Sequence, residues 1–200
     1  MDGYRTAPAL VIIDVQRAID DPGWEKHGKR NHPEAERQMA RLLAAWRERK
    51  LPIYHVRHDS RHAESPYRPG QPGNEFKPEL APLAGEAIVP KQTNSAFVGT
   101  DFEQQLRRAG HLTLVVAGVI TNNSVEATVR MAGNLGFETY LAEDACFTFP
   151  RPDWEGRLRT AEEVHAMSLA NLHGEYCTVL TTDEVIRRLG PVNRGAVGRG

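Results

Sequence analysis

Three side chains suited to acid–base or nucleophilic chemistry stand at the ends of short apolar runs. Asp14 directly follows the run 9–13, and Lys91 follows a second, shorter run. Ser124 closes the turn 118–124, which leads into a helical pattern. A carboxylate and an ammonium beside a helix N-terminus can transfer protons and stabilise a developing oxyanion. Taken singly, each residue also has an ordinary interpretation, as a turn cap, a solvated charge or a first-turn helix residue.

The elements that must position these residues alternate along the chain. Apolar runs predict strands at 9–13, 51–56, 87–89, 112–117, 137–141 and 176–180. Helical spacing predicts helices at 33–50, 102–109, 123–135, 161–172 and 183–189. This alternation favours an α/β fold of three layers, α/β/α, around a mostly parallel six-stranded sheet. Ligands of such sheets bind beyond the carboxyl ends of the strands, where all three side chains would lie.

Composition narrows the class of protein. The chain has 200 residues and a net charge of -1, which argues against a nucleic-acid or membrane partner held by bulk charge. No apolar run approaches the roughly 18–20 residues of a membrane span. Two cysteines cannot form a disulfide framework, so we expect a cytoplasmic protein. Residues 1–190 are expected to form one domain and 191–200 a flexible tail, while 58–85 is a long loop of the kind that closes over sites.

Four segments taken together resemble the isochorismatase-like cysteine hydrolases, over roughly residues 7–185. The segments are ALVIIDVQ (9–16), VPKQTNSAFVGTDFEQQLRRAG (89–110), LVVAGVITNNSVEATVRMAGNLGF (114–137) and LAEDACFTF (141–149). Their order and spacing carry the resemblance. The family includes nicotinamidases, N-carbamoyl-amine amidohydrolases, ureide-pathway hydrolases and isochorismatase itself.

The resemblance implies hydrolysis of a small-molecule carbon–nitrogen bond, amide or carbamoyl, by an Asp–Lys–Cys triad. It assigns catalytic roles to Asp14 and Lys91, and it places Ser124 where most amidase members carry Cys. It also implies a cis peptide before Ile120, whose N–H would form an oxyanion hole with that of Ser124. A homo-oligomer, a dimer or larger, is implied as well, and no organic cofactor.

The serine leaves four interpretations open, because a hydroxyl needs a stronger local base than a thiol does. Ser124 is the nucleophile of a slow serine amidase, or it replaces a cysteine in order to trap substrate. Alternatively, the chain follows the isochorismatase branch, in which Asp14 protonates a vinyl ether and no covalent nucleophile is needed. The fourth interpretation is a catalytically silent relative that binds a ligand or partner.

Other residues are candidates for the pocket rather than for the chemistry. Gln16, Trp24 and Phe76 are predicted to contact the substrate, and each has an alternative role in loop packing. The histidines His55, His58 and His62 lack the Asp-x-His spacing of the nicotinamidase metal site, so no metal site is predicted. Cys146 and Cys177 are interpreted as small core residues.

Overall fold

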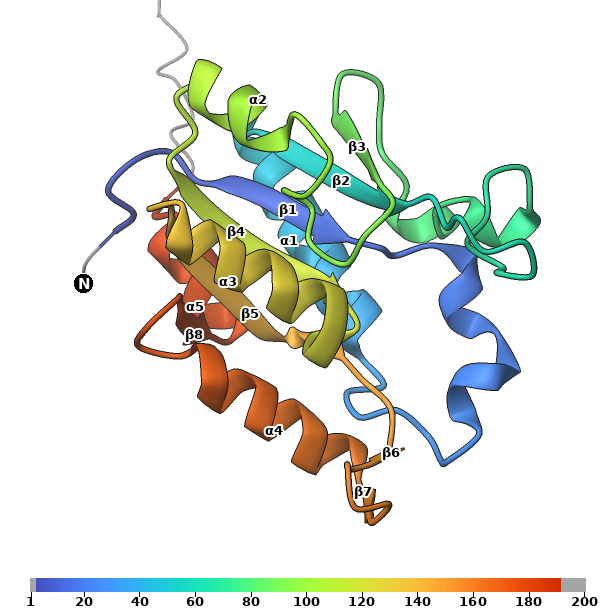
Figure 1. Ribbon diagram of the computed structural model, residues 1–200. Helices are drawn as coiled ribbons and strands as arrows, with labels where there is room; N and C mark the ends of the chain where they lie inside the picture. The colour runs from blue at the N-terminus through green and yellow to red at the C-terminus, as the bar shows by residue number, and fades with distance from the viewer. Residues whose placement is uncertain (1–2, 192–200) are drawn as a thin grey trace, which may run out of the picture.

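A six-stranded sheet organises the computed structural model, which describes residues 3–191 (Figure 1). Its strand order is β3-β2-β1-β4-β5-β8, and every neighbouring pair is parallel. The strands are β1 (Ala9–Ile13), β2 (Ile53–His58), β3 (Ala87–Lys91), β4 (Thr113–Val119), β5 (Glu138–Phe147) and β8 (Thr178–Leu180). A short antiparallel ribbon joins β6 (Arg151–Pro152) to β7 (Leu158–Arg159). The predicted α/β class is confirmed.

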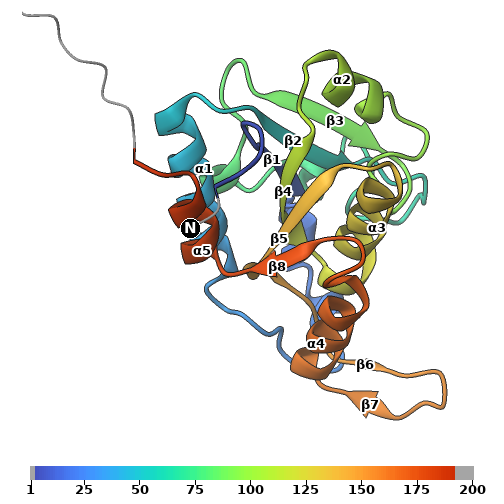
Figure 2. The ribbon, with the colours of Figure 1, turned by 90° about the vertical axis from the view of Figure 1, so that its left-hand side faces the viewer.

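Helices cover both faces of this sheet, as the view along the layers shows (Figure 2). The helices are α1 (Ala35–Arg49), α2 (Phe102–Arg108), α3 (Glu126–Asn134), α4 (Ala161–Leu172) and α5 (Thr182–Arg188). Short 3-10 segments lie at Arg17–Asp20, Pro22–Glu25, Pro72–Asn74 and Pro78–Leu80. Helices α1 and α5 lie on one face, whereas α2, α3 and α4 lie on the other.

Alternation along β1 divides the core between these two faces. Leu10 and Ile12 join the cluster that includes α1, while Val11 and Ile13 join the cluster that includes α2 and α3. All five residues of β1 are buried because the strand is covered on both faces. The continuous apolar run therefore specifies a central strand, and the residue after it emerges at the middle of the sheet edge.

Two predicted element boundaries differ from the structure. Strand β5 continues to Phe147 rather than ending at residue 141, because a register shift between Val116 and Gly118 of β4 lets pairing resume at Cys146. The helix predicted to begin at residue 123 instead begins at Glu126, after a π-helical turn, Thr121–Val125. This turn carries Ser124.

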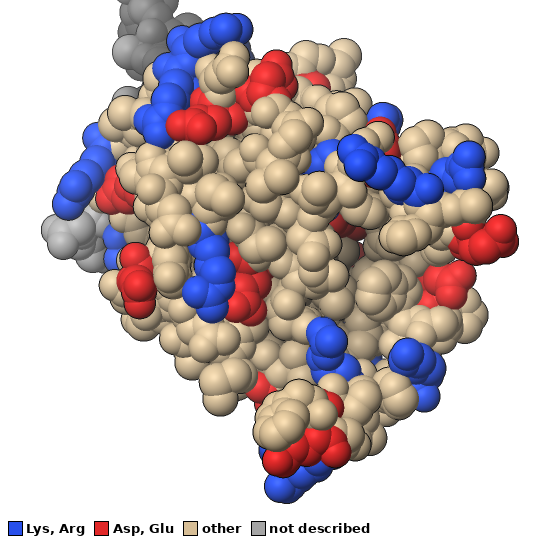
Figure 3. All heavy atoms as spheres, viewed as in Figure 1, with Lys and Arg blue, Asp and Glu red and all other residues tan. Residues whose placement is uncertain are grey.

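Several expectations about the whole chain concern its ends and surface. No helix among residues 3–191 is long and apolar enough to cross a membrane. On the face shown in Figure 3, basic and acidic side chains are interspersed in small groups. The single domain over 1–190 stays a prediction, and the predicted tail lies, apart from Pro191, outside the described residues.

Candidate active site

The carboxyl ends of four adjacent strands converge at one edge of the sheet (Figure 1). Asp14 follows β1, and Val119 ends β4 beside it. His58 and Lys91 end β2 and β3, where the two residues pair in register. The sheet order β3-β2-β1-β4 therefore brings together residues that are far apart in the sequence.

Lys91 is the hub of this edge. Its side chain is fully buried, and Nζ donates to Asp14 Oδ2 at 2.6 Å. It also donates to the Thr93 carbonyl at 3.0 Å and to Ser124 Oγ at 3.3 Å. An ammonium has three protons, so these three acceptors use all of them. The group is therefore arranged to donate to Ser124, not to accept a proton from it.

Asp14 retains one free acceptor. Its second carboxylate oxygen, Oδ1, is buried and has no hydrogen-bond partner among the described residues. The residue has a φ of 55°, and its amide is held by the Val56 carbonyl. Burial raises the pKa of Asp14 above its usual value, although the Lys91 ammonium and the Ser124 hydroxyl act to lower it. The carboxylate is thus a stronger base than an exposed aspartate.

Ser124 is presented by the segment that follows β4. The Val119–Ile120 peptide bond is cis, at the position that the resemblance implies. The next turn is π-helical, with the Val125 amide donating to the Ile120 carbonyl, and α3 follows it directly. The positive end of α3 therefore lies beside the Ser124 hydroxyl.

Gly118 permits this arrangement. It has a φ of 129°, and a Cβ atom there would lie 2.6 Å from the backbone nitrogen of Ile13 and closer still to its carbonyl oxygen. Only glycine lets β4 approach β1 this closely just before the turn that carries Ser124.

A cavity of about 220 Å³ opens onto these groups. Its lining includes Asp14, His58, Ile120 and Ser124. A second hollow of about 560 Å³ adjoins it and shares Ile120 in its wall. A small acyl group fits the inner cavity, and the remainder of a substrate would extend into the outer hollow.

Aromatic rings form the wall between the two hollows, which share Trp24 and Tyr67. Trp24 stacks on Phe149, with ring centroids 5.7 Å apart, and meets Tyr67 edge-on at 6.5 Å. Its indole nitrogen donates to the Ala18 carbonyl, which fixes the ring. Trp24, predicted to contact substrate, therefore lies where it can do so.

Gln16 and Phe76, also predicted to contact substrate, do not line the inner cavity. The Gln16 side chain is fully buried and binds His58 through both its backbone N–H (2.7 Å) and its carbonyl (3.0 Å), as well as the Asn74 carbonyl. Phe76 pairs with Gln16 as an isolated bridge and places its ring against His55. Both residues anchor the long loop, because their polar and aromatic groups are already occupied by it.

The three histidines of the second strand and its loop separate in the structure. His58 and His62 line the inner cavity. His55 is buried elsewhere, with Nε2 2.8 Å from Glu86 Oε2. Burial, aided by the Lys91 charge, lowers the pKa of His58, which keeps its imidazole neutral near pH 7.

The cysteines lie in the core rather than at this edge. Cys146 is fully buried within β5, and burial raises the pKa of its thiol well above the usual range. Burial also raises the pKa of Cys177, to about 12. Neither thiol has the exposure or the acidity of a nucleophile.

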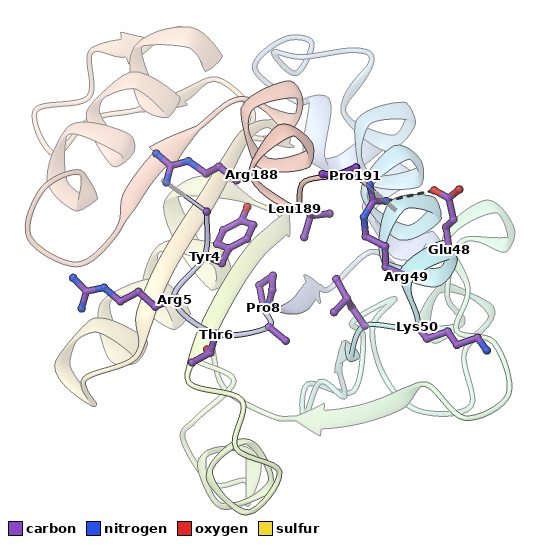
Figure 4. A pocket seen from close by; sticks show the side chains of 13 residues that line it. Tyr4, Arg5, Thr6, Pro8, Glu48, Arg49, Lys50, Arg188, Leu189 and Pro191 are labelled. Atoms are coloured by element: carbon purple, nitrogen blue, oxygen red, sulfur yellow. Dashed lines mark hydrogen bonds and ion pairs between the residues drawn. The ribbon is translucent and has the colours of Figure 1, made fainter. Parts of the chain in front are cut away.

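A larger hollow, of about 720 Å³, lies at the opposite end of the strands (Figure 4). Its wall includes Pro8 and Leu51, which precede β1 and β2, together with Arg188. It therefore opens at the amino ends of the strands, away from the acid, amine and hydroxyl groups.

Sequence reasoning did not single out Tyr67 and Asn74, which shape the site. Asn74 Nδ2 donates to the carbonyls of His58 and Tyr67 and to Asp59 Oδ1, and so folds the loop back on β2. No spacing in the loop indicates these contacts, because both residues act across a segment without regular structure.

Comparison with known proteins places this geometry in a family context. The profile of the isochorismatase domain matches residues 8–184. The isochorismatase family protein YrdC of Bacillus subtilis is 39% identical over 89% of this chain and 94% of its own length. The maleamate amidohydrolase of Pseudomonas putida is 26% identical over 94% of this chain and 89% of its own length.

The fold matches solved structures as closely. A crystal structure of an isochorismatase-family protein from Chromobacterium violaceum shares 60% sequence identity and superimposes with a TM-score of 0.90. The match covers 94% of this chain and 96% of the other.

Proposed function

This chain belongs to the isochorismatase family of hydrolases, and we propose that it cleaves a carbon–nitrogen bond, amide or carbamoyl, of a small molecule. The observation that carries the proposal is the position of Lys91 Nζ, which lies 2.6 Å from Asp14 and 3.3 Å from Ser124 beside a cavity of about 220 Å³. The amidohydrolase among the relatives supports the choice of bond.

In the proposed reaction, Asp14 is the base and Ser124 the nucleophile. Because the protons of Lys91 are already donated, the free oxygen of Asp14 is the acceptor available for the hydroxyl proton. As the proton moves, Ser124 Oγ bonds to the substrate carbonyl carbon, and the carbonyl electron pair moves onto its oxygen. The backbone N–H groups of Ile120 and Ser124 would bind that oxyanion.

The tetrahedral adduct then collapses. Asp14 gives its proton to the leaving nitrogen, the carbon–nitrogen bond breaks and an amine or ammonia departs, leaving an ester on Ser124. A water molecule attacks the ester while Asp14 takes its proton, and the acid is released as Ser124 regains a hydrogen. Lys91 stays an ammonium throughout, stabilising negative charge on either neighbour.

The environment of the outer hollow bears on the substrate. Lys26, His27 and Arg151 lie in its wall, so a carboxylate on the substrate would find cationic partners there. Trp24 and Tyr67 would cover a planar group between that carboxylate and the reacting carbonyl. We therefore propose small acidic amides as the first substrates to examine.

The test compares the natural chain with Ser124→Ala and Ser124→Cys on a panel of maleamate, N-carbamoyl amines, ureides and isochorismate. We expect amide turnover in the natural chain, at least about 10³-fold less with alanine and activity retained or raised with cysteine. Rapid quenching followed by intact-mass measurement would detect the acyl group on Ser124. Amide turnover unchanged by alanine would contradict the proposed nucleophile.

Vinyl-ether cleavage is the second candidate, favoured by one specific observation. Burial raises the pKa of Asp14, and a carboxylic acid that holds its proton is suited to protonating a vinyl ether. This reaction needs no nucleophile, so isochorismate turnover would survive Ser124→Ala. No turnover of any panel compound by the natural or the cysteine form would instead indicate a binding protein.

Assembly and location are further proposals. The homo-oligomer and the cytoplasmic location expected from the sequence stay predictions. Size-exclusion chromatography with light scattering measures the first, and a monomer at micromolar concentration would contradict it.

A further inference from the structure

Two imidazoles and a carboxylate converge at a place separate from the Asp14–Lys91–Ser124 edge. His32 lies in the loop before α1, Glu143 on β5 and His165 on α4. One ligand atom from each lies within 4.8 Å of the other two. Glu143 Oε2 is 3.8 Å from His32 Nε2 and 3.6 Å from His165 Nε2.

The outer nitrogens of both rings are already engaged. His32 Nδ1 lies 3.0 Å from the Cys146 carbonyl, which can only accept, so this nitrogen carries the proton and Nε2 keeps its lone pair. His165 Nδ1 lies 2.9 Å from the Thr121 hydroxyl. This is how metal-binding histidines are usually held, with one nitrogen fixed by an outer partner and the other facing the ion.

The inner atoms lack partners of their own. The His165 side chain is 6% exposed, and its buried Nε2 makes no hydrogen bond among the described residues. Within residues 3–191, no Lys or Arg forms an ion pair with Glu143. A buried lone pair and a carboxylate without a fixed cation face one another here, and a bound cation would satisfy both.

We propose that His32, Glu143 and His165 bind one divalent transition-metal ion, of which zinc is the representative. Two imidazoles and one carboxylate suit zinc, whose ligand atoms lie about 3.3 Å apart in a tetrahedral site. The separations of 3.6 and 3.8 Å need only small side-chain movements to reach that value. The partly exposed side chains of His32 and Glu143 leave an open side for water as the fourth ligand.

The ion would brace the catalytic turn from behind. It joins the loop before α1, the end half of β5 and helix α4 into one unit. Through its outer nitrogen His165 contacts Thr121, three residues before Ser124, while Ser168 of α4 bonds the Thr121 carbonyl. The role is therefore structural, and it requires no part of the proposed reaction.

The test is zinc binding by tag-free, chelator-treated protein, followed by calorimetric titration with zinc chloride. We expect one zinc per chain, confirmed by elemental analysis after desalting, and a melting temperature raised by several degrees at saturation. His32→Asn and Glu143→Gln are expected to weaken binding at least 10-fold each. Asparagine is chosen because residue 32 has a φ of 46°, which asparagine tolerates.

Two matched controls locate the ion. His27→Asn changes an exposed histidine and is expected to leave zinc affinity unchanged. His58→Asn removes the histidine of the inner cavity and is expected to do the same. Absence of binding at 100 µM zinc, equal affinity in the His32 and Glu143 variants, or loss of zinc in His58→Asn would each overturn the proposal.

A second measurement does not depend on how the variants fold. Crystals of the natural chain soaked in zinc should show an anomalous peak between His32, Glu143 and His165 at the zinc absorption edge. A peak beside His58 and His62 alone would place the ion in the inner cavity and overturn the assignment. Because neither experiment measures turnover, failure here leaves the proposed hydrolase reaction untouched.

Discussion

Lys91 Nζ lies 2.6 Å from Asp14 Oδ2, although 77 positions separate the two residues in the sequence. The two side chains are 0% and 6% exposed. A buried ion pair gains little net stability because both charges lose their hydration, but removal of one partner leaves the other charge buried and uncompensated. The pair is therefore costly to break and is suited to holding a reactive carboxylate in place.

Lys91→Met should lower the free energy of unfolding by about 3–5 kcal/mol, since it leaves the Asp14 carboxylate buried without its cation. Asp14→Asn in the same chain should restore part of that loss because it removes the orphaned charge. Chemical denaturation of the two single variants and the double variant measures the coupling. Lys26→Met, at an exposed position, is the control, and additive effects in the cycle would contradict the interpretation.

The pH dependence of amide hydrolysis should report Asp14. A base acts when ionised, and burial raises the pKa of this carboxyl, so kcat/KM should rise with pH through a value above the usual 3.8 and then level off. Asp14→Asn should abolish the activity, whereas His58→Asn should leave the position of this limb unchanged. Vinyl-ether cleavage would show the opposite slope, because there the protonated acid is the active form.

Gln16→Leu should loosen the loop that carries Tyr67. The substitution removes two hydrogen bonds to the His58 backbone and one to the Asn74 carbonyl, which should lower the free energy of unfolding by about 2–3 kcal/mol. Because Gln16 positions the cavity wall without facing the reacting groups, KM should rise more than kcat falls. Steady-state kinetics check this, with the exposed Gln104→Leu as the control. A fall in kcat alone would indicate a direct role.

Glu86→Gln should destabilise the protein in a pH-dependent manner. Burial acts to raise the pKa of Glu86, but Arg47, the Leu83 amide and His55 outweigh it and lower the pKa to about 2. A lowered pKa means that stability is present above the unfolded value, near 4.5, and is lost as pH falls toward 2. We expect a loss of about 2–3 kcal/mol at pH 7 that shrinks on acidification.

Denaturation curves at pH 7, 4 and 3 measure that difference. The matched control is Glu79→Gln, because the Glu79 side chain is 53% exposed and lies 3.9 Å from Lys77. A stability difference that stays constant over this range would contradict the assignment.

Most of the fold followed from local patterns. The apolar run of β1 predicts a strand buried on both faces, and the alternation of strands with helices predicts a parallel sheet, because only a covering helix can connect parallel neighbours. The same logic places Asp14, Lys91 and Ser124 at one edge, since parallel strands share the direction of their carboxyl ends. These features depend on periodicity and chain direction, which the sequence contains.

The rest depended on contacts between segments that no periodicity links. Gln16 became a loop anchor, not a wall of the cavity, because its amide is bound by His58 and Asn74. Asp14 became a stronger base because the folded chain removes it from water. His32, Glu143 and His165 met only once three elements had packed. The sequence determined the sheet and the edge at which its polar residues gather. Tertiary structure decided which of them face the cavity and how basic they are, because burial and hydrogen-bond partners exist only after folding.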